Sequence, residues 1–210
     1  MPDLPQTRQS LLIELGKRSD VAWSEFLDVY ENAIIRYCIR RGLQEADARD
    51  AAQLVYAAIQ HKVAGWDHDA ARGSFRAWLF RVARNISVDL ISARSKAAVS
   101  GDSRVSVLLS EISDHRQRDP DASTIFQLEW RRALFEWAAS HVQHDVREVT
   151  WKAFCLTAIE GKSAETVASQ LSIPVGSVYT AKCRVVARIR NKIDEWSNDL
   201  PEEEQRNWLD

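Results

Sequence analysis

The sequence predicts an all-α protein made of two small helical domains joined by a flexible linker. Almost every patterned segment of the 210 residues places apolar side chains at helical spacing, and no stretch alternates apolar and polar side chains as a half-buried strand does. Only seven glycines and five prolines occur, so few positions interrupt a helix. Hydrophobic residues make up 45% of the chain and charged residues 28%, which is the balance of an ordinary globular protein.

The first predicted helix begins near Asp20, which could cap it, and ends at Gly42, because glycine often follows the last turn of a helix. Its inward face carries seven large or apolar side chains: Trp23, Phe26, Leu27, Tyr30, Ile34, Tyr37 and Cys38. A second helix begins near Asp47 and stops at Gly65. Its inward residues are mostly small: Ala48, Ala51, Ala52, Val55 and Ile59.

A third predicted helix, capped by Ser74, has two contrasting faces. The apolar stripe follows the i, i+3, i+4, i+7 template: Phe75, Trp78, Leu79, Val82, Ala83, Ile86 and Leu90. The opposite side carries Arg81, Arg84, Asn85 and Val88, and Arg76 and Arg94 flank it. Cations can hold phosphates and an amide can read a base edge, so this face suits single-stranded DNA. A solvated helix face without a ligand is the alternative interpretation. These helices complete a first domain, residues 1–96.

A linker and a second domain follow. Residues 97–123 are rich in Ser and Asp and have no long periodic segment, which predicts a flexible linker. Residues 124–196 form the second predicted domain, and the acidic tail 197–210 is expected to be mobile. The helices predicted in the second domain are Ile125–Val142, Val146–Ala158, Ser163–Leu171 and Gly176–Trp196.

The last two helices of this domain have the spacing of a helix-turn-helix, whose second helix enters the major groove of DNA. The turn is Ser172 to Val175, and the residues that pack the two helices together are Val167, Ala168, Leu171, Val178, Ala181 and Val185. Side chains on the second helix could reach base edges and phosphates: Ser177, Thr180, Arg184 and Arg188. Lys182 is expected toward the packed side with its amine exposed. Two packed helices with a solvated basic face are the alternative.

The net charge of −2 hides a local concentration of cations. Six basic residues and one acid lie between Ala70 and Lys96, and five basic residues and no acid between Gly176 and Lys192. Local basic faces, rather than the charge of the whole chain, make the electrostatic footprint on phosphates. Both candidate DNA-binding helices are therefore consistent with this balance.

Other classes of protein find little support. The three cysteines, Cys38, Cys155 and Cys183, are far apart, and no histidine stands beside them at metal-ligand spacing. No phosphate loop, catalytic carboxylate pair or nucleophile motif occurs, so we expect no metal, no cofactor and no enzymatic activity. No apolar run is long enough to span a bilayer, and Met1 to Ser10 lack the apolar core of a signal peptide, so we expect a cytoplasmic protein.

Three segments resemble the sigma-70 family of RNA polymerase sigma factors. Residues 48–56, ARDAAQLVY, resemble region 2.2, and residues 73–85, GSFRAWLFRVARN, with Asp89 after them, resemble regions 2.3 and 2.4. Residues 161–188 are similar to region 4.2. The order and spacing of these segments resemble the extracytoplasmic function (ECF) group, which keeps only regions 2 and 4.

The resemblance implies a role for each matching position. Asp50 and Gln53 would bind the clamp helices of the largest polymerase subunit, and the flap of the second-largest subunit would be a further contact. Asn85 would read a flipped-out base of the minus-ten promoter element, with nearby phosphates held by the cations of the same helix, Arg76, Arg81, Arg84 and Arg94. The minus-thirty-five element would be read by Ser177, Thr180, Lys182, Arg184 and Arg188. An anti-sigma protein is an expected partner.

The sequence thus predicts an alternative sigma factor that binds core RNA polymerase, directs promoter-specific initiation and is associated with the nucleoid when bound to polymerase. Because polymerase supplies much of the binding, the free protein is expected to bind DNA poorly. The alternative is a helix-turn-helix regulator that acts without joining polymerase. Strong DNA binding by the free protein would favour that alternative.

Overall fold

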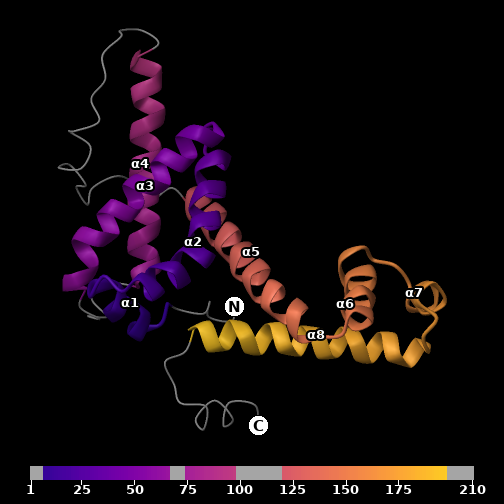
Figure 1. Ribbon diagram of the computed structural model, residues 1–210. Helices are drawn as coiled ribbons and strands as arrows, with labels where there is room; N and C mark the ends of the chain where they lie inside the picture. The colour runs from indigo at the N-terminus through magenta and orange to yellow at the C-terminus, as the bar shows by residue number, and fades with distance from the viewer. Residues whose placement is uncertain (1–6, 67–73, 98–119, 198–210) are drawn as a thin grey trace. The chain divides into compact units, whose positions relative to one another are not determined.

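The computed structural model describes residues 7–66, 74–97 and 120–197, and every regular element in these ranges is a helix (Figure 1). The predicted all-α fold class is therefore confirmed. The described chain divides after Ala133 into two compact units. Most of the predicted tail and most of the predicted linker lie outside the described residues, at 198–210 and 98–119; Ser197, the first residue of the predicted tail, ends a helix.

The first unit contains the four helices that precede the linker, a short 3₁₀ turn and the beginning of a fifth helix (Figure 1). Their bounds are α1 Gln9–Gly16, α2 Asp20–Arg40, α3 Glu45–Lys62, η1 Val63–Gly65, α4 Phe75–Ala97 and α5 Pro120–Asp145. Helix α3 packs against both α2 and α4. Three of these helices are those that the sequence predicted; α3 begins two residues before the predicted start.

The core of the first unit lies on the predicted stripe of α2. Five residues of that stripe are buried: Phe26, Tyr30, Ile34, Tyr37 and Cys38. Trp23 and Leu27, at the margin of the stripe, are only half-buried. On α3 the buried face is mostly alanine, and small side chains let neighbouring helices approach closely.

The ends of these helices follow local chemistry. Ser19, rather than Asp20, caps α2: its hydroxyl oxygen accepts a hydrogen bond from the Ala22 amide at 3.4 Å. Asp20 instead is the first helical residue, where a carboxylate favours the positive end of the helix dipole. Ser74 caps α4 as predicted, accepting from the Ala77 amide at 3.2 Å. Gly42 follows α2 with a φ of +100°, which explains why the helix ends there.

Helix α1 was not among the predicted elements. It is only 8 residues long, and its buried side chains, Leu11, Leu12 and Leu15, pack it against η1 and α2. At Gly16 an added Cβ would lie 3.1 Å from the Cα of Ala64, so glycine permits this close approach. Tertiary packing stabilises such a short helix, because isolated helices of this length are marginal in water.

The second unit contains the end of α5 and the C-terminal helices α6 Glu148–Phe154, α7 Ala164–Leu171 and α8 Val175–Ser197. A π-helical turn, η3 Cys155–Ile159, continues α6. Residues of α5, α6 and α8 share one apolar cluster: Ala138, Val142, Phe154, Val185 and Ile189. A second cluster joins α6 to the last two helices: Ala153, Ala164, Val167, Ala168, Val178 and Ala181.

A short turn joins α7 to α8. Ser163 caps α7, accepting from the Thr166 amide at 3.2 Å. Ser172 ends it in a left-handed conformation, with φ 53° and ψ 46°, and the Ile173 amide bonds to the Ala168 carbonyl at 3.0 Å. The residues predicted to pack the two helices are buried, apart from Leu171, which is half-buried. The assignment of this pair as a DNA-binding helix-turn-helix stays a prediction.

Helix α5 differs most from its prediction. It begins at Pro120 rather than Ile125, so residues 120–123 of the predicted linker are helical, and Ala97 belongs to α4. The two units divide within α5, after Ala133, whereas the predicted second domain began at residue 124. The physical reason is that Phe126, Glu129 and Trp130 are buried in the first unit.

Two kinds of feature are absent from the described residues. None of their helices is long and apolar enough to cross a membrane. In the same part of the chain, no group of three or more His, Cys, Asp or Glu side chains is arranged to hold a metal ion.

Candidate polymerase and nucleic-acid interface

Helix α3 presents Asp50 and Gln53 to solvent. Their exposure follows from the helix period, because the neighbouring residues Ala48, Ala51 and Ala52 lie on the opposite side of the helix and face the core. The two polar side chains lie one turn apart, so a single partner surface can contact both. Both residues thus lie on an exposed face, as expected; their predicted role in binding polymerase stays a prediction.

Helix α4 brings the predicted minus-ten residues to one face. Arg81 is exposed, and Arg84 and Asn85 are half-buried, while Leu79, Val82, Ala83 and Ile86 on the opposite side belong to the core. A guanidinium one turn from an amide can hold a phosphate beside a base that the amide contacts. Arg94 belongs to the same helix, but its side chain lies outside the described residues.

Arg76 has a different environment from the one expected. Its guanidinium carbon lies 4.4 Å from the centre of the Trp130 ring, as in a cation–π contact between α4 and the beginning of α5. Burial lowers the pKa of this guanidinium, which nevertheless stays charged because free arginine is protonated far above neutral pH. Arg76 thus contacts another part of the chain instead of standing fully open to a phosphate.

Three aromatic residues gather at the start of α4. The ring centres of Trp66 and Phe75 are 5.3 Å apart, those of Trp66 and Trp78 also 5.3 Å, and those of Phe75 and Trp78 5.5 Å. Phe75 is buried, whereas both tryptophans are half-buried. The expectation that Trp78 serves packing agrees with these contacts, and Trp66 is equally engaged.

The predicted residues of α8 divide into two groups. Ser177, Thr180, Lys182 and Arg184 are exposed, and the Thr180 hydroxyl also donates to the Gly176 carbonyl at 2.9 Å. Arg188 is exposed as well, but its guanidinium donates a hydrogen bond to the Asp145 carbonyl at the end of α5, at 2.9 Å. A cation is favourable at that position, because the last carbonyls of a helix lack partners within it.

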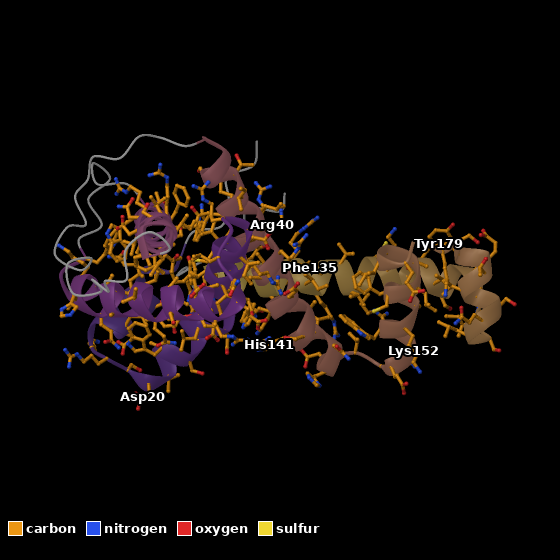
Figure 2. All side chains as sticks on the ribbon, turned by 90° about the horizontal axis from the view of Figure 1, so that it is seen from above. Asp20, Arg40, Phe135, His141, Lys152 and Tyr179 are labelled. Carbon is orange, nitrogen blue, oxygen red and sulfur yellow. The ribbon has the colours of Figure 1, made fainter. Side chains whose placement is uncertain are left out.

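Two residues on the outer side of α8 were missed by sequence reasoning. Tyr179, labelled in Figure 2, is 57% exposed. Cys183, one turn further along, is exposed as well. Lys182 was expected on the packed side of α8, and this prediction is wrong: its side chain is exposed. It lies beside Tyr179 in a pocket that Thr157 and Lys162 also line. The signal that could have found them is the helix period measured from the buried residues Val178, Ala181 and Val185.

Comparison with known proteins places the first unit in a family. The family described as Sigma-70 region 2 matches residues 26–97, the part of the chain from the middle of α2 to the end of α4. That range includes Asp50, Gln53 and the basic face of α4.

Three relatives extend the similarity beyond this range. The chain is 22% identical over 178 residues to the ECF RNA polymerase sigma factor SigE of Mycolicibacterium smegmatis, covering 85% of this chain and 64% of that protein. It is 24% identical to the RNA polymerase sigma-H factor of Pseudomonas aeruginosa, covering 91% of this chain and 95% of that protein. It is 23% identical to the ECF RNA polymerase sigma-E factor of Haemophilus influenzae, with coverages of 89% and 95%.

The region 2 match includes two of the three segments that resemble sigma factors, residues 48–56 and 73–85, whereas residues 161–188 lie outside it. Together, the family match over residues 26–97 and the three relatives support the assignment of this chain to the sigma-70 family of RNA polymerase sigma factors, in its extracytoplasmic function group.

Proposed function

We propose that this protein is an alternative sigma factor that binds core RNA polymerase and directs transcription initiation from a specific set of promoters. The observation that carries the proposal is the position of Asp50 and Gln53: both are exposed, one turn apart, within the range that matches sigma-70 region 2. In this proposal they contact the clamp helices of the largest polymerase subunit.

DNA contacts are divided between the two units. Arg81, Arg84 and Asn85 share one face of α4 and contact the minus-ten element, where a base leaves the stack. The exposed residues of α8 contact the minus-thirty-five element as duplex: Ser177, Thr180, Lys182 and Arg184. Tyr179 and Cys183 join this set because they stand beside Thr180 on the exposed side. Arg188 contributes by holding α8 against the end of α5.

The proposal includes further expectations from the resemblance. The flap of the second-largest polymerase subunit and an anti-sigma protein are the other partners, and the protein acts in the cytoplasm, on the nucleoid when polymerase is bound. It carries no catalytic activity of its own, because it directs an enzyme that another protein supplies.

The decisive experiment is co-elution with bacterial core RNA polymerase in size-exclusion chromatography. Wild-type protein should co-elute at micromolar concentration, and the double variant Asp50→Ala/Gln53→Ala should not. A matched control is Asp28→Ala/Gln60→Ala, which removes one exposed acid and one exposed glutamine from other positions on α2 and α3 and should co-elute normally.

The remaining outcomes are equally informative. Co-elution of all three proteins would keep the sigma factor proposal and move the polymerase contact away from Asp50 and Gln53. If neither the wild type nor any variant co-elutes, the proposal is wrong, and a search for a duplex that the protein binds alone would follow.

A further inference from the structure

The first half of α5 is bound to the first unit by one face. Phe126, Glu129, Trp130 and Ala133 follow the i, i+3, i+4, i+7 spacing, and each is at most 2% exposed. On the opposite side Leu128 is 46% exposed. The segment from residue 123 to residue 133 is therefore an amphipathic helix seated on another surface.

That surface is formed by α2 and α4. The Phe126 ring meets Tyr37 of α2 and Phe80 of α4, with ring centres 5.5 and 5.4 Å apart. Beside these rings, Arg76 covers the Trp130 ring. Arg40, at the end of α2 and labelled in Figure 2, forms an ion pair with Glu129. The contact thus joins an aromatic centre to two arginines.

Glu129 places a buried carboxylate in this contact, next to two arginines. Its carboxylate is fully buried. Arg40 Nε lies 2.7 Å from Glu129 Oε1, which is the distance of an ion pair, but the two atoms do not have the geometry of a hydrogen bond. Arg132 adds a weaker contact at 3.4 Å to Oε2. Desolvating a carboxylate offsets most of what such a pair gains, so the charged part of the contact adds little net stability.

The attachment to the rest of the chain favours the docked state at any protein concentration. Residues 98–119 join the end of α4 to α5, so docking is intramolecular. The effective concentration of the segment at its binding surface is then about millimolar. A small interface with a buried charge can then stay closed in the free protein and still open when a stronger partner competes.

Arg76 connects this contact to DNA binding. It stands in the first turn of α4, before the basic face of Arg81, Arg84 and Asn85. Trp130 covers one face of its guanidinium, and the approach of a phosphate from that side is blocked. Docking therefore withdraws one cation from the surface that the proposed function assigns to the minus-ten element.

We propose that residues 123–133 are an autoinhibitory segment: docked on α2 and α4, they hold Arg76 against Trp130 and lower the affinity of the first unit for single-stranded DNA. The inference rests on the proposed function for the role of α4, but the contact itself is a property of the free chain. Undocking of the segment releases Arg76 to a phosphate.

The test combines two measurements on the full-length chain. Hydrogen exchange reports docking: residues 123–133 should exchange slowly in the wild type and quickly in Trp130→Ala, with α2 and α3 unchanged. Binding of a mixed-sequence single-stranded DNA oligonucleotide at low salt reports the consequence. Trp130→Ala should bind about threefold to tenfold more tightly, the effect of one charge-assisted contact.

Two controls separate the causes. Arg76→Ala added to Trp130→Ala should abolish the gain in DNA affinity, and Leu128→Ala, on the exposed side of α5, should change neither measurement. If Trp130→Ala does not fold, Phe126→Leu is the milder variant: it removes the ring contacts with Tyr37 and Phe80, and the same changes in exchange and affinity are expected.

The inference is wrong if residues 123–133 exchange quickly in the wild type, or if undocking leaves DNA affinity unchanged. Co-elution with core polymerase distinguishes this failure from that of the proposed function. Undocking without a gain in DNA affinity, in a protein that co-elutes, would overturn the autoinhibitory segment alone. A gain in affinity without co-elution would support the segment and overturn the sigma factor proposal.

Discussion

At the scale of the residue, the environment decides which arginines are available to DNA. Arg76 and Arg81 were predicted to contact the minus-ten element and Arg188 the minus-thirty-five element, because the sequence shows only their charge and spacing. In the folded chain Arg81 is exposed, Arg76 lies over Trp130, and Arg188 bonds to the end of α5. A cation on a helix can thus serve the protein itself, since its long side chain reaches the carbonyls and rings of neighbouring helices.

Replacing Arg188 tests its structural role. Arg188→Ala should lower the free energy of unfolding of the second unit by about 0.5–1 kcal/mol, because the Asp145 carbonyl loses its hydrogen bond but stays accessible to water. Urea unfolding followed by circular dichroism measures the change. Arg184→Ala, an exposed arginine of the same helix, should stay within about 0.5 kcal/mol of the wild type. Equal effects of the two substitutions would contradict this role.

At the scale of the element, short signals at helix ends set the boundaries, and one of them is strained. Ser74 and Ser163 cap their helices through their hydroxyl groups, as their positions in the sequence suggest. Ser172 ends α7 in the left-handed region, where glycine is the usual residue because a Cβ is unfavourable there. The turn between α7 and α8 therefore forms at a cost.

Removing that cost should stabilise the second unit. Ser172→Gly should raise the free energy of unfolding by about 0.5–1 kcal/mol, because glycine has no Cβ and adopts the left-handed conformation without steric cost. Ser169→Gly, inside α7, is the matched control and should lower it by about the same amount. Thermal and urea unfolding of both variants measure these changes, which should be opposite in sign. A loss of stability in Ser172→Gly would show that the strain is relieved elsewhere.

At the scale of the whole molecule, the two units differ in what they bury. The first unit encloses Tyr30, Tyr37 and Cys38 in one core, and burial raises the pKa of each to about 12. Their unfolded values are 10.0, 10.0 and 9.0. In the second unit the Cys155 thiol, less deeply buried, also has a raised pKa. The free energy of unfolding of the first unit should therefore depend more strongly on alkaline pH than that of the second unit.

That coupling predicts an alkaline transition. A raised pKa in the folded state means that the stability from these groups is complete below about pH 9, and is lost as the pH rises through about 12. The first unit should lose stability in this window before the second unit does. Circular dichroism together with the tyrosinate absorbance measures the transition.

Cys38→Ala provides the control for this transition. It should reduce the slope of stability against pH, because one of the titrating groups is gone, even though the small cavity lowers stability at neutral pH. An unchanged slope would show that the thiol does not contribute to the transition.

The sequence by itself determined the all-α class, the faces of α2, α3 and α4, the pair α7–α8 and the resemblance to sigma factors. These properties repeat every three or four residues or depend on single caps, so they can be read locally. It did not reveal α1, whose 8 residues are stabilised by Leu11, Leu12 and Leu15 packing on other segments. Nor did it place the division between the units within α5, or show that Arg76 and Arg188 are engaged. Only the tertiary structure decided these features, because each depends on contacts between residues distant in the chain, such as Arg40 with Glu129 and Arg76 with Trp130.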